Sequence, residues 1–583
     1  MIGILVLLLT NYLSGYFLFR LFFKRVNTFE IVVLPQIFSM VVTPIIFYIL
    51  YLAAGFDTAL YILPLVSLAT CFVSLMKKQQ VYRENIGKKF LILLFVLFSF
   101  FIAMVFINYF LNFSELGDMG SWISISKEIV NSKSLPPDYP CFYGNKVHFQ
   151  WLYHLMASLI SIYSKVDVFY VMPFFGAYLS ILFSLICFMI ARKYLKEVKI
   201  AFFAMSVIAI FFLGRYTDLS YNGYGLIIAM SAIYTFMVYR EEKSVKLAFL
   251  VGAISSSIIY FHAFSFFFSS LFIISYLLYK IIFGMNKKDM GQILIIILTF
   301  VLVLPYILPS MQFTKTFFMF EPFSGLLFNY ISTFNILLIA LPFGILLMMK
   351  NRDEMSLIFL SFLITLFVVL NTFVTTGGPA YGYFLQYMVI PVVMISFNYV
   401  KSLSEFKKNL FFVLAVALFL YPYLIYANLS PDKNILMSDE YTASGWISMN
   451  TGKNETVLTS DTPLYIALSG RKTIVCQSVS LIGEHVNPKE NFADMVMLYT
   501  NPSMDLMEKY KISYVVIGDK EKDFFKKYDL TPYNFSSPAF ETSYSHGSVK
   551  VFKLVDGARL PLKMNENIRN SLNFTSYSRW WQV

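Results

Sequence analysis

The chain carries a series of apolar runs that are each long enough, or nearly long enough, to cross a lipid bilayer. A helix needs about 20 apolar residues to span the hydrocarbon core. With 58% hydrophobic and only 14% charged residues, the composition excludes a soluble protein of this length. We therefore expect a polytopic α-helical membrane protein with about 14 transmembrane helices, at 2–23, 31–52, 58–76, 90–111, 168–191, 200–214, 223–239, 247–261, 263–283, 291–309, 326–349, 355–374, 381–398 and 409–427.

The basic residues set the expected orientation of these helices. The net charge of +12 comes from cations in short loops between apolar runs, which indicates membrane topology rather than nucleic-acid binding. We divide the apolar stretch 247–283 at His262, because only then is every second loop basic. The apolar residues 2–23 precede their positive charges, so they predict a first span and not a cleaved signal. The N-terminus, loop 112–167 and everything after 428 are then expected outside the cell membrane.

The polar C-terminal region is typical of a small extracytoplasmic α/β domain. Strands are predicted at 456–459, 473–476, 514–517 and 549–554, and helices at 440–450, 489–499 and 502–511. Cys141 and Cys476 are both expected outside, which leaves a disulfide between them open. The expected domains are three N-terminal transmembrane helices (1–89), a transmembrane core with loop 112–167 (90–427), the α/β domain (428–556) and a tail (557–583).

Loop 112–167 holds the residues best suited to chemistry. Glu115 and Asp118 follow a span directly, and two amphipathic segments come after them, the second carrying His148 and His154. Amphipathic helices rich in aromatic residues lie in the membrane interface. A carboxylate held between them would meet the head group of a lipid on a side that water can reach. Alternatively, Asp118 only caps the helix that starts at Met119.

Three further segments add to a resemblance. The loop's Leu-Pro-Pro and Tyr-Pro break with FQWLYHLMASLIS, and later ASGWISMNTGKNETVLT, ALSGRKTIV and KYKISYVVIGDKE, resemble GT-C superfamily glycosyltransferases, such as protein O-mannosyltransferases and the aminoarabinose transferase. The resemblance implies a GT-C-like core, a polyprenyl-phosphate sugar donor and an inverting transfer. It also implies that Asp118 is the general base or a metal ligand, with Glu115 beside it.

The leaving phosphate of such a donor needs nearby positive charge or hydrogen-bond donors. The candidates on the predicted outer side are Arg215, His262, Tyr383 and Gln386, with Lys146 and Lys315 as weaker ones. Asp218, His148, His154 and Arg471 are candidates for binding substrate or metal, and each has an alternative as an ordinary loop, anchor or core residue. A divalent cation, Mg²⁺ or Mn²⁺, is a candidate cofactor.

Two departures from the family pattern and two competing functions remain. The chain has no WWDYG motif, which disfavours an oligosaccharyltransferase, and no Asp-x-Asp pair in the first loop, which leaves metal dependence open.

The expected partners are the bilayer, the lipid-linked donor and a glycan, lipid or protein acceptor, with no nucleic acid. The alternatives are a flippase or transporter of lipid-linked saccharides and a polymerase or ligase of the same compounds. A transporter would be expected to carry charges deep in its spans and internal repeats.

Overall fold

The computed structural model describes residues 2–76, 79–82, 87–111, 119–135, 137, 151–213, 221–283, 290–301, 333–351, 353–372, 379–426, 438–453, 455–460, 462–474 and 488–563. The chain divides into two compact units. The first, which we call the bundle, comprises residues 1–106 and 174–428. The second, the mixed unit, joins residues 107–173 to residues 429–583.

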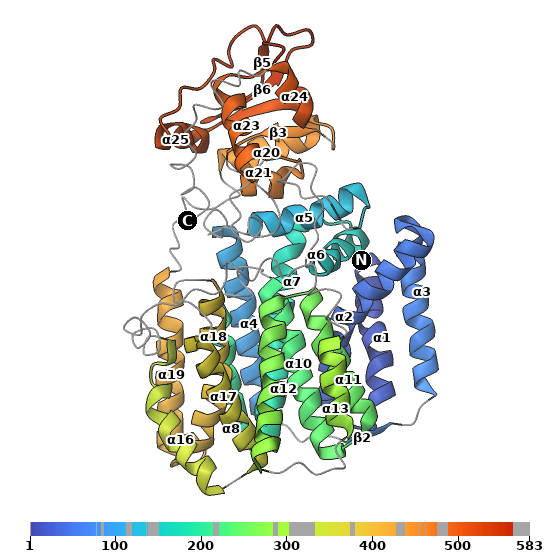
Figure 1. The fold of residues 1–583 in the computed structure, drawn as a ribbon, viewed down its shortest axis with the longest axis vertical. Coiled ribbons are helices and arrows are strands. Elements are labelled where there is room, and N and C mark those ends of the chain that lie inside the picture. Colours follow the sequence, from blue (N-terminus) through green and yellow to red (C-terminus); the bar gives the residue numbers. More distant parts are fainter. Residues whose placement is uncertain are drawn as a thin grey trace. The chain divides into compact units, whose positions relative to one another are not determined.

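The bundle begins with three helices that pack on one another (Figure 1). These are α1 (Ile2–Phe22), α2 (Thr28–Ala54) and α3 (Phe56–Leu75). Asn27 and Glu30 form a reciprocal capping box that starts α2, since each side chain accepts a hydrogen bond from the backbone of the other residue. A short parallel pair, β1 (Arg25–Asn27) and β2 (Gln80–Tyr82), precedes α4 (Lys88–Leu111).

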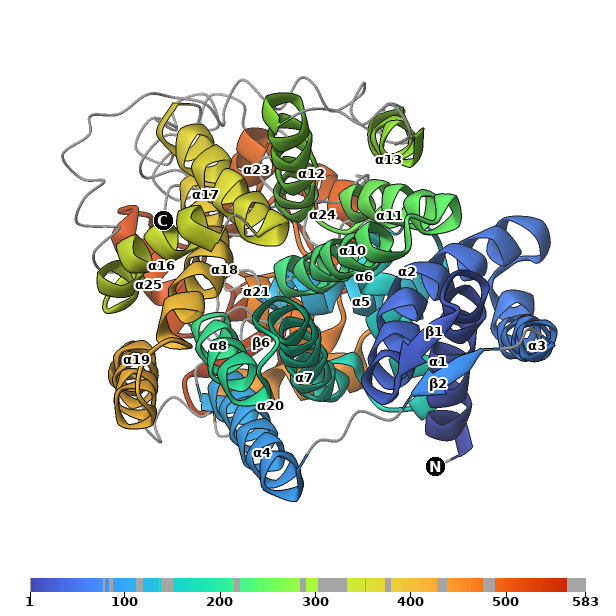
Figure 2. The same ribbon diagram turned by 90° about the horizontal axis from the view of Figure 1, so that it is seen from below.

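The other bundle helices form a continuous packed array, seen end-on in Figure 2. The pairs in contact include α10 with α12, α12 with α17, α17 with α18, and α18 with α8. The elements are α7 (Val168–Leu195), α8 (Val198–Phe211), α10 (Tyr221–Glu242), α11 (Val245–Ser257), η2 (Ile258–Tyr260), α12 (Ala263–Phe283), α13 (Met290–Val301), α16 (Leu337–Asn351), α17 (Glu354–Thr372), α18 (Pro379–Val400) and α19 (Glu405–Tyr426).

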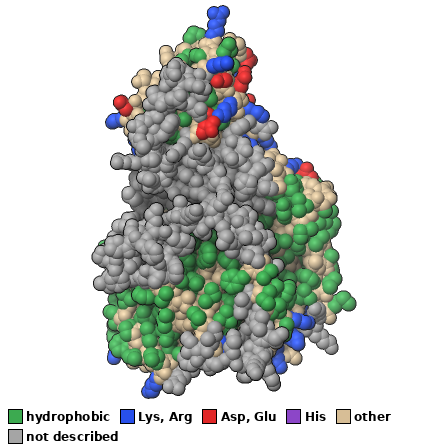
Figure 3. Space-filling view, in the orientation of Figure 1, with side chains coloured by type: hydrophobic (Ala, Val, Ile, Leu, Met, Phe, Trp, Pro, Cys, Tyr) green, Lys and Arg blue, Asp and Glu red, His purple; other side chains and the backbone are tan. Residues whose placement is uncertain are grey.

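Every predicted span overlaps a described helix, and the helix breaks at His262 as the charge pattern requires. Six of the described helices are long and apolar enough to cross a membrane. Large apolar side chains stand exposed on the outer helices, for example Tyr61 at 80% and Phe95 at 73%, and hydrophobic side chains cover much of the bundle surface in Figure 3. Such a surface requires lipid around it. The number of crossings stays a prediction.

One end of the bundle is held together by ion pairs. Arg240, at the end of α10, pairs with Glu354 at the start of α17, and Lys280 near the end of α12 lies 3.2 Å from the same carboxylate. Lys401, after α18, donates to the carbonyl of Leu195 at the end of α7. The ends of α7, α10, α12 and α18 therefore meet at this end of the bundle. The starts of α10, α12 and α18 lie at the opposite end.

The mixed unit contains helices from both chain segments and one sheet. The helices are α5 (Met119–Ser132), α6 (Trp151–Ser164), α20 (Asp439–Asn450), α21 (Thr462–Ser469), α23 (Pro488–Thr500), α24 (Met504–Tyr510) and α25 (Asp519–Lys527). The strands β3 (Thr456–Leu458), β4 (Ile512–Ile517), β5 (Phe540–His546) and β6 (Val549–Leu554) form a sheet in the order β3-β4-β6-β5. Strands β3 and β4 are parallel, and the other pairs are antiparallel.

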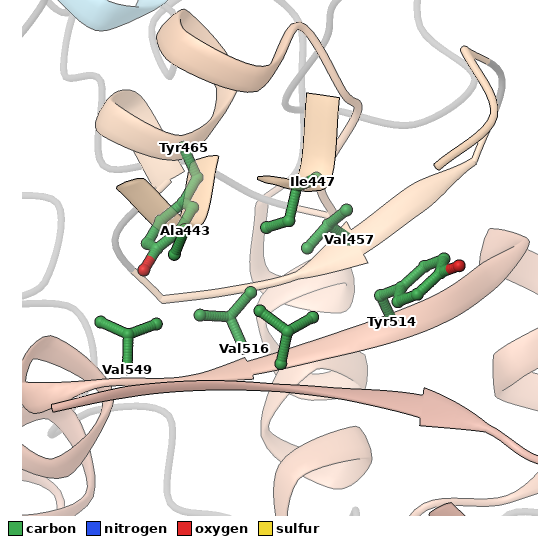
Figure 4. Packing of buried hydrophobic residues seen from close by; sticks show 8 residues of the cluster. Ala443, Ile447, Val457, Tyr465, Tyr514, Val516 and Val549 are labelled. Atoms are coloured by element: carbon green, nitrogen blue, oxygen red, sulfur yellow. The ribbon is translucent and has the colours of Figure 1, made fainter. Parts of the chain in front are cut away.

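One face of this sheet buries the core of the unit. Ala443 and Ile447 of α20 and Tyr465 of α21 lie over Val457 and Val516 of the strands (Figure 4). The β5–β6 hairpin turns at Gly547, where φ is +52° and a Cβ atom would lie 1.9 Å from the carboxylate of Asp439. Only glycine fits this turn.

Two features of the mixed unit differ from the sequence-based expectation. The region predicted as a strand at 473–476 contributes an isolated bridge at Lys472 instead, while residues 475–476 lie outside the described part. Helices α21 and α25 and strand β5 were not predicted. The helices of loop 112–167 cluster with the C-terminal segment in the mixed unit. The expected division of the chain into domains stays a prediction.

Candidate functional site

A cluster of polar and aromatic side chains lies at the end of the bundle opposite the ion pairs. Its centre is His262, which occupies the break between η2 and α12 and is 1% exposed. The imidazole Nδ1 lies 2.7 Å from the hydroxyl of Ser265, and the hydroxyl of Tyr387 on α18 lies 3.1 Å from that of Ser265. The ring of Tyr383, one turn earlier on α18, is 5.5 Å from the imidazole. We call these four residues the His262 cluster.

The hydrogen bonds of the cluster indicate which imidazole nitrogen carries the proton. The backbone N–H of Ser265 donates to Nδ1 of His262 at 3.2 Å. An accepting Nδ1 in a neutral imidazole places the proton on Nε2, which makes Nε2 a donor. The cluster is thus built from hydroxyl and imidazole groups that orient a single N–H bond. A phosphate oxygen is a suitable acceptor for such a donor.

Helix α10 approaches His262 closely because Gly225 faces it. A Cβ atom at this position would lie 2.4 Å from the Cβ of His262 and 3.1 Å from the Ser265 hydroxyl. Tyr224, the preceding residue, donates its hydroxyl to the carbonyl of Met40 on α2. Helices α10, α12 and α18 therefore surround the imidazole, and α2 is bonded to α10 beside it.

The structure brings together only some of the predicted site residues. His262 and Tyr383 are in contact, and Gln386 is half-buried on α18 next to Tyr387. Ser265 and Tyr387 were missed, although Ser265 lies three residues after His262, at a spacing that a helix start makes favourable for contact. The remaining predicted residues of these groups lie outside the described part of the chain: Glu115, Asp118, Lys146, His148, Arg215, Asp218 and Lys315.

His154 is a packed histidine of the mixed unit. It is 1% exposed on α6, its Nδ1 lies 3.3 Å from the hydroxyl of Ser126, and it stacks on Trp122. Burial lowers its pKa to about 3, from an ordinary value of 6.5. His154 is therefore neutral and holds α6 against α5. A role in binding substrate or metal stays a prediction.

Arg471 is also buried by the fold, at 5% exposure. Its guanidinium donates to the carbonyls of Ser448 and Thr451 at 2.6 and 2.8 Å, and to the hydroxyl of Thr451 at 2.7 Å. These contacts satisfy the last carbonyls of α20, where a cation is favourable. Burial lowers the pKa of Arg471 from its ordinary value. Its proposed contact with substrate stays a prediction.

Helix α5, which begins directly after Asp118, is tied to the C-terminal segment by charged side chains. Lys127 lies 2.9 Å from Asp167 and donates to the carbonyl of Leu468 at 2.8 Å. Glu128 lies 3.2 Å from Lys472. Burial lowers the pKa of Lys127, and the nearby Asp167 carboxylate opposes this shift.

The edge where parallel strands of α/β sheets commonly bind ligands is filled here by the chain itself. Glu521 is fully buried, and its carboxylate accepts hydrogen bonds from Thr459, Ser460 and Gly518, which follow the ends of β3 and β4. This carboxylate satisfies the N–H and O–H groups that follow the two parallel strands, so it fastens the start of α25 to this edge of the sheet.

No metal site is apparent in the described residues, since they contain no group of three or more His, Cys, Asp or Glu side chains that could hold an ion. Cys71 and Cys187 are buried free thiols, as expected for cysteines within apolar runs. Cys141 and Cys476 lie outside the described part of the chain, as do Glu115 and Asp118.

Comparison with known proteins gives a fold and no sequence relative. No protein-family model matches the sequence, and no curated protein matches it. Among solved structures, ArnT from Cupriavidus metallidurans bound to undecaprenyl phosphate matches with a TM-score of 0.53 and 13% identity, over 78% of this chain and 98% of the ArnT chain. The chain has the fold of ArnT, a GT-C glycosyltransferase.

The apo form of ArnT from the same organism matches in the same way. Its TM-score is 0.51 at 13% identity, over 79% of this chain and 98% of the ArnT chain. The ArnT-like fold and the six long apolar helices make this a helical membrane protein. The GT-C expectation that was based on the first loop and the C-terminal segments is confirmed at the level of the fold.

Proposed function

We propose that this protein is a membrane glycosyltransferase that moves a sugar from a polyprenyl-phosphate-linked donor to an acceptor on the extracytoplasmic face of the cell membrane. The observation that carries the proposal is the ArnT-like fold, which extends over 98% of an ArnT chain whose structure holds undecaprenyl phosphate. Both chain termini and the mixed unit are then on the outer side. The acceptor is a glycan, lipid or protein.

In the proposed reaction, the carboxylate of Asp118 acts as the general base, with Glu115 near it. It takes the proton of an acceptor O–H group while the acceptor oxygen attacks the anomeric carbon. The bond from that carbon to the phosphate oxygen breaks, and polyprenyl phosphate leaves with the electron pair. Attack from the face opposite the leaving group inverts the configuration. If a divalent cation is required, Asp118, Glu115 and Asp218, together with His148 or His154, are the candidate ligands, and the cation would neutralise phosphate charge.

The His262 cluster suits the leaving phosphate in this scheme. The Nε2–H bond of His262 is oriented by Ser265 and Tyr387 before any ligand arrives, and preorganised donors stabilise developing charge without a reorganisation cost. Tyr383 and Gln386 on α18 would supply further donors, and Arg215 would supply the positive charge. Arg471 remains a weaker candidate for acceptor contact, because its guanidinium caps α20.

Single-turnover transfer from a polyprenyl-phosphate sugar tests the assigned base. In the purified full-length protein, Asp118→Asn should lower the transfer rate by about 1,000-fold, as expected when a general base is removed. Binding of polyprenyl phosphate should be unchanged. Glu490→Gln, an exposed carboxylate of the mixed unit that pairs with Lys509, is the matched control and should retain most of the rate. Wild-type transfer by a folded Asp118→Asn protein would refute the role of Asp118.

A further inference from the structure

Residues 468–472 (Leu-Ser-Gly-Arg-Lys) form a short segment that contacts helix α5 at three points. We call this segment the docking loop. Its two hydrogen bonds to α5 join residues 341 and 339 positions apart in the chain, and all three contacts lie within the mixed unit. Two of the three are made by charged side chains of α5 that are almost completely buried.

The first contact is made by Lys127, whose side chain is 8% exposed. Its ammonium group lies between the carbonyl of Leu468, in the last turn of α21, and the carboxylate of Asp167. The end of a helix is a favourable place for a cation because its last carbonyls point outward. Asp167 also accepts a hydrogen bond from the backbone N–H of Phe169 at 2.8 Å, which anchors it at the start of α7. One ammonium group thus joins α5 to the end of α21 and to Asp167, all within the mixed unit.

The second and third contacts lie further along the docking loop. Glu128 and Lys472 form an ion pair with side chains 7% and 16% exposed, and Asn131 donates to the carbonyl of Gly470 at 3.4 Å. Gly470 has φ +68°, and a Cβ atom there would lie 3.3 Å from the amide of Asn131. The backbone of the docking loop must therefore be glycine-like at this point for α5 to approach.

The docking loop is itself held by the rest of the mixed unit. Arg471 fixes it to α20 through the carbonyls of Ser448 and Thr451. The carbonyl of Lys472 accepts a hydrogen bond from the backbone N–H of Val457 on β3 at 2.9 Å. Helix α5 is consequently attached to a loop that cannot shift without disturbing both α20 and the sheet.

We infer that the docking loop sets the orientation of α5, and that Lys127 and Glu128 are positioning residues for the carboxylate of Asp118. This inference rests on the proposed function. Asp118 is bonded directly to Met119, the first residue of α5, and a helix transmits an orientation rigidly over the distance of about 12 Å from Lys127 to that residue. A displacement of about 1 Å at a reacting group can lower a rate by about 100-fold.

A charge exchange between Glu128 and Lys472 separates positioning from general stability. In full-length protein reconstituted with a polyprenyl-phosphate sugar, Glu128→Lys and Lys472→Glu should each lower kcat by at least about tenfold, with KM for the donor changed by less than about twofold. The double exchange restores the opposite charges and should return kcat to within about threefold of wild type. Here kcat is counted per folded, donor-binding protein, because a smaller folded fraction would itself lower the apparent kcat and leave KM unchanged.

Two controls make the result decisive. Lys509→Glu disrupts an ion pair with the buried Asp494 in the same unit, away from α5, and should leave the kcat of the folded protein near wild type. Amide hydrogen exchange over residues 119–132 reports the attachment of α5 without any substrate, and should rise in both single variants and recover in the double variant. Single variants with freely exchanging α5 amides and wild-type kcat would overturn the inference, as would a double variant that stays slow.

Failure of the proposed function gives a different pattern. If wild-type protein transfers no sugar from any polyprenyl-phosphate donor, the glycosyltransferase proposal fails, and the positioning inference falls with it. The amide hydrogen-exchange rates of α5 then still decide whether the docking loop holds this helix. If Asp118→Asn transfers at the wild-type rate while the charge-exchanged variants are slow, the inference that the docking loop positions Asp118 is overturned.

Discussion

The His262 cluster and the docking loop bury polar groups in opposite ways. The cluster consists of an imidazole and hydroxyl groups that share hydrogen bonds, with a proton placed on Nε2. The docking loop and α5 bury formal charges, and those of Lys127, Glu128 and Lys472 each have an oppositely charged partner. A neutral site can receive an anion without first giving up a counterion, whereas paired charges serve to fasten two segments together. The contrast favours the cluster as a binding site and the docking loop as an attachment.

Substitution of Lys127 is the strongest test of the charged contacts that attach α5 to the docking loop. Lys127→Met removes the ammonium group and leaves the partly buried carbonyl of Leu468 without its charged donor. The ion pair with Asp167 adds little, because that carboxylate is half exposed and screened by water. Loss of a hydrogen bond from a charged donor costs about 2 kcal/mol, so amide exchange of α5 should accelerate by about 30-fold. Lys127→Arg keeps the charge and should cost less than half as much. An unchanged exchange rate in Lys127→Met would show that the attachment depends on packing and not on charge.

The stability of the His262 cluster should depend on close packing and not on charge, because the cluster, all four residues of which the structure describes, contains no ion pair. Gly225→Ala places a methyl group 2.4 Å from the Cβ of His262, so α10 or the imidazole must move. Such overpacking costs about 2 kcal/mol, and the thermal unfolding midpoint should fall. Gly445→Ala, in α20, meets no atom within 4 Å and should be neutral or slightly stabilising. Equal unfolding midpoints for the two variants would contradict the close contact between α10 and His262.

His154 supplies a third, smaller test, because it is a buried histidine that serves packing. Its pKa of about 3 in the folded protein lies below the ordinary histidine value of 6.5, so the unfolded chain binds a proton that the folded protein excludes. Stability is therefore lost as the pH falls below 6.5, by about 1.4 kcal/mol at pH 5.5. His154→Gln should reduce the difference in unfolding midpoint between pH 7.5 and pH 5.5. The exposed His546→Gln should not, and equal effects of the two would exclude burial as the cause.

The helices could be predicted from the sequence because each signal is local. Apolar runs mark the bundle helices, and alternating basic loops placed the break at His262. The β5–β6 hairpin also had a local signal, the Gly547-Ser548 turn, but the strand before it is mostly polar, at Glu541 to Ser545, and was not recognised.

The contacts that define the candidate sites could not be predicted in the same way. Lys127 meets Leu468, and Ser265 meets Tyr387, across 341 and 122 positions respectively. Such pairs depend on how helices pack, which a single sequence does not specify. The prediction named Tyr383 and Gln386 on α18 but not Tyr387. Residues one turn apart lie on one face of a helix, and which face of α18 meets His262 is known only once the helices have packed.

Release of polyprenyl phosphate tests the central claim most directly. Purified full-length protein in lipid vesicles is mixed with a polyprenyl-phosphate sugar and membrane acceptors, and the products are followed by mass spectrometry. The account predicts that free polyprenyl phosphate and glycosylated acceptor appear together in equal amounts, and that Asp118→Asn forms neither at a comparable rate. Movement of the intact lipid-linked sugar across the bilayer with no bond broken would contradict it, and would identify a transporter.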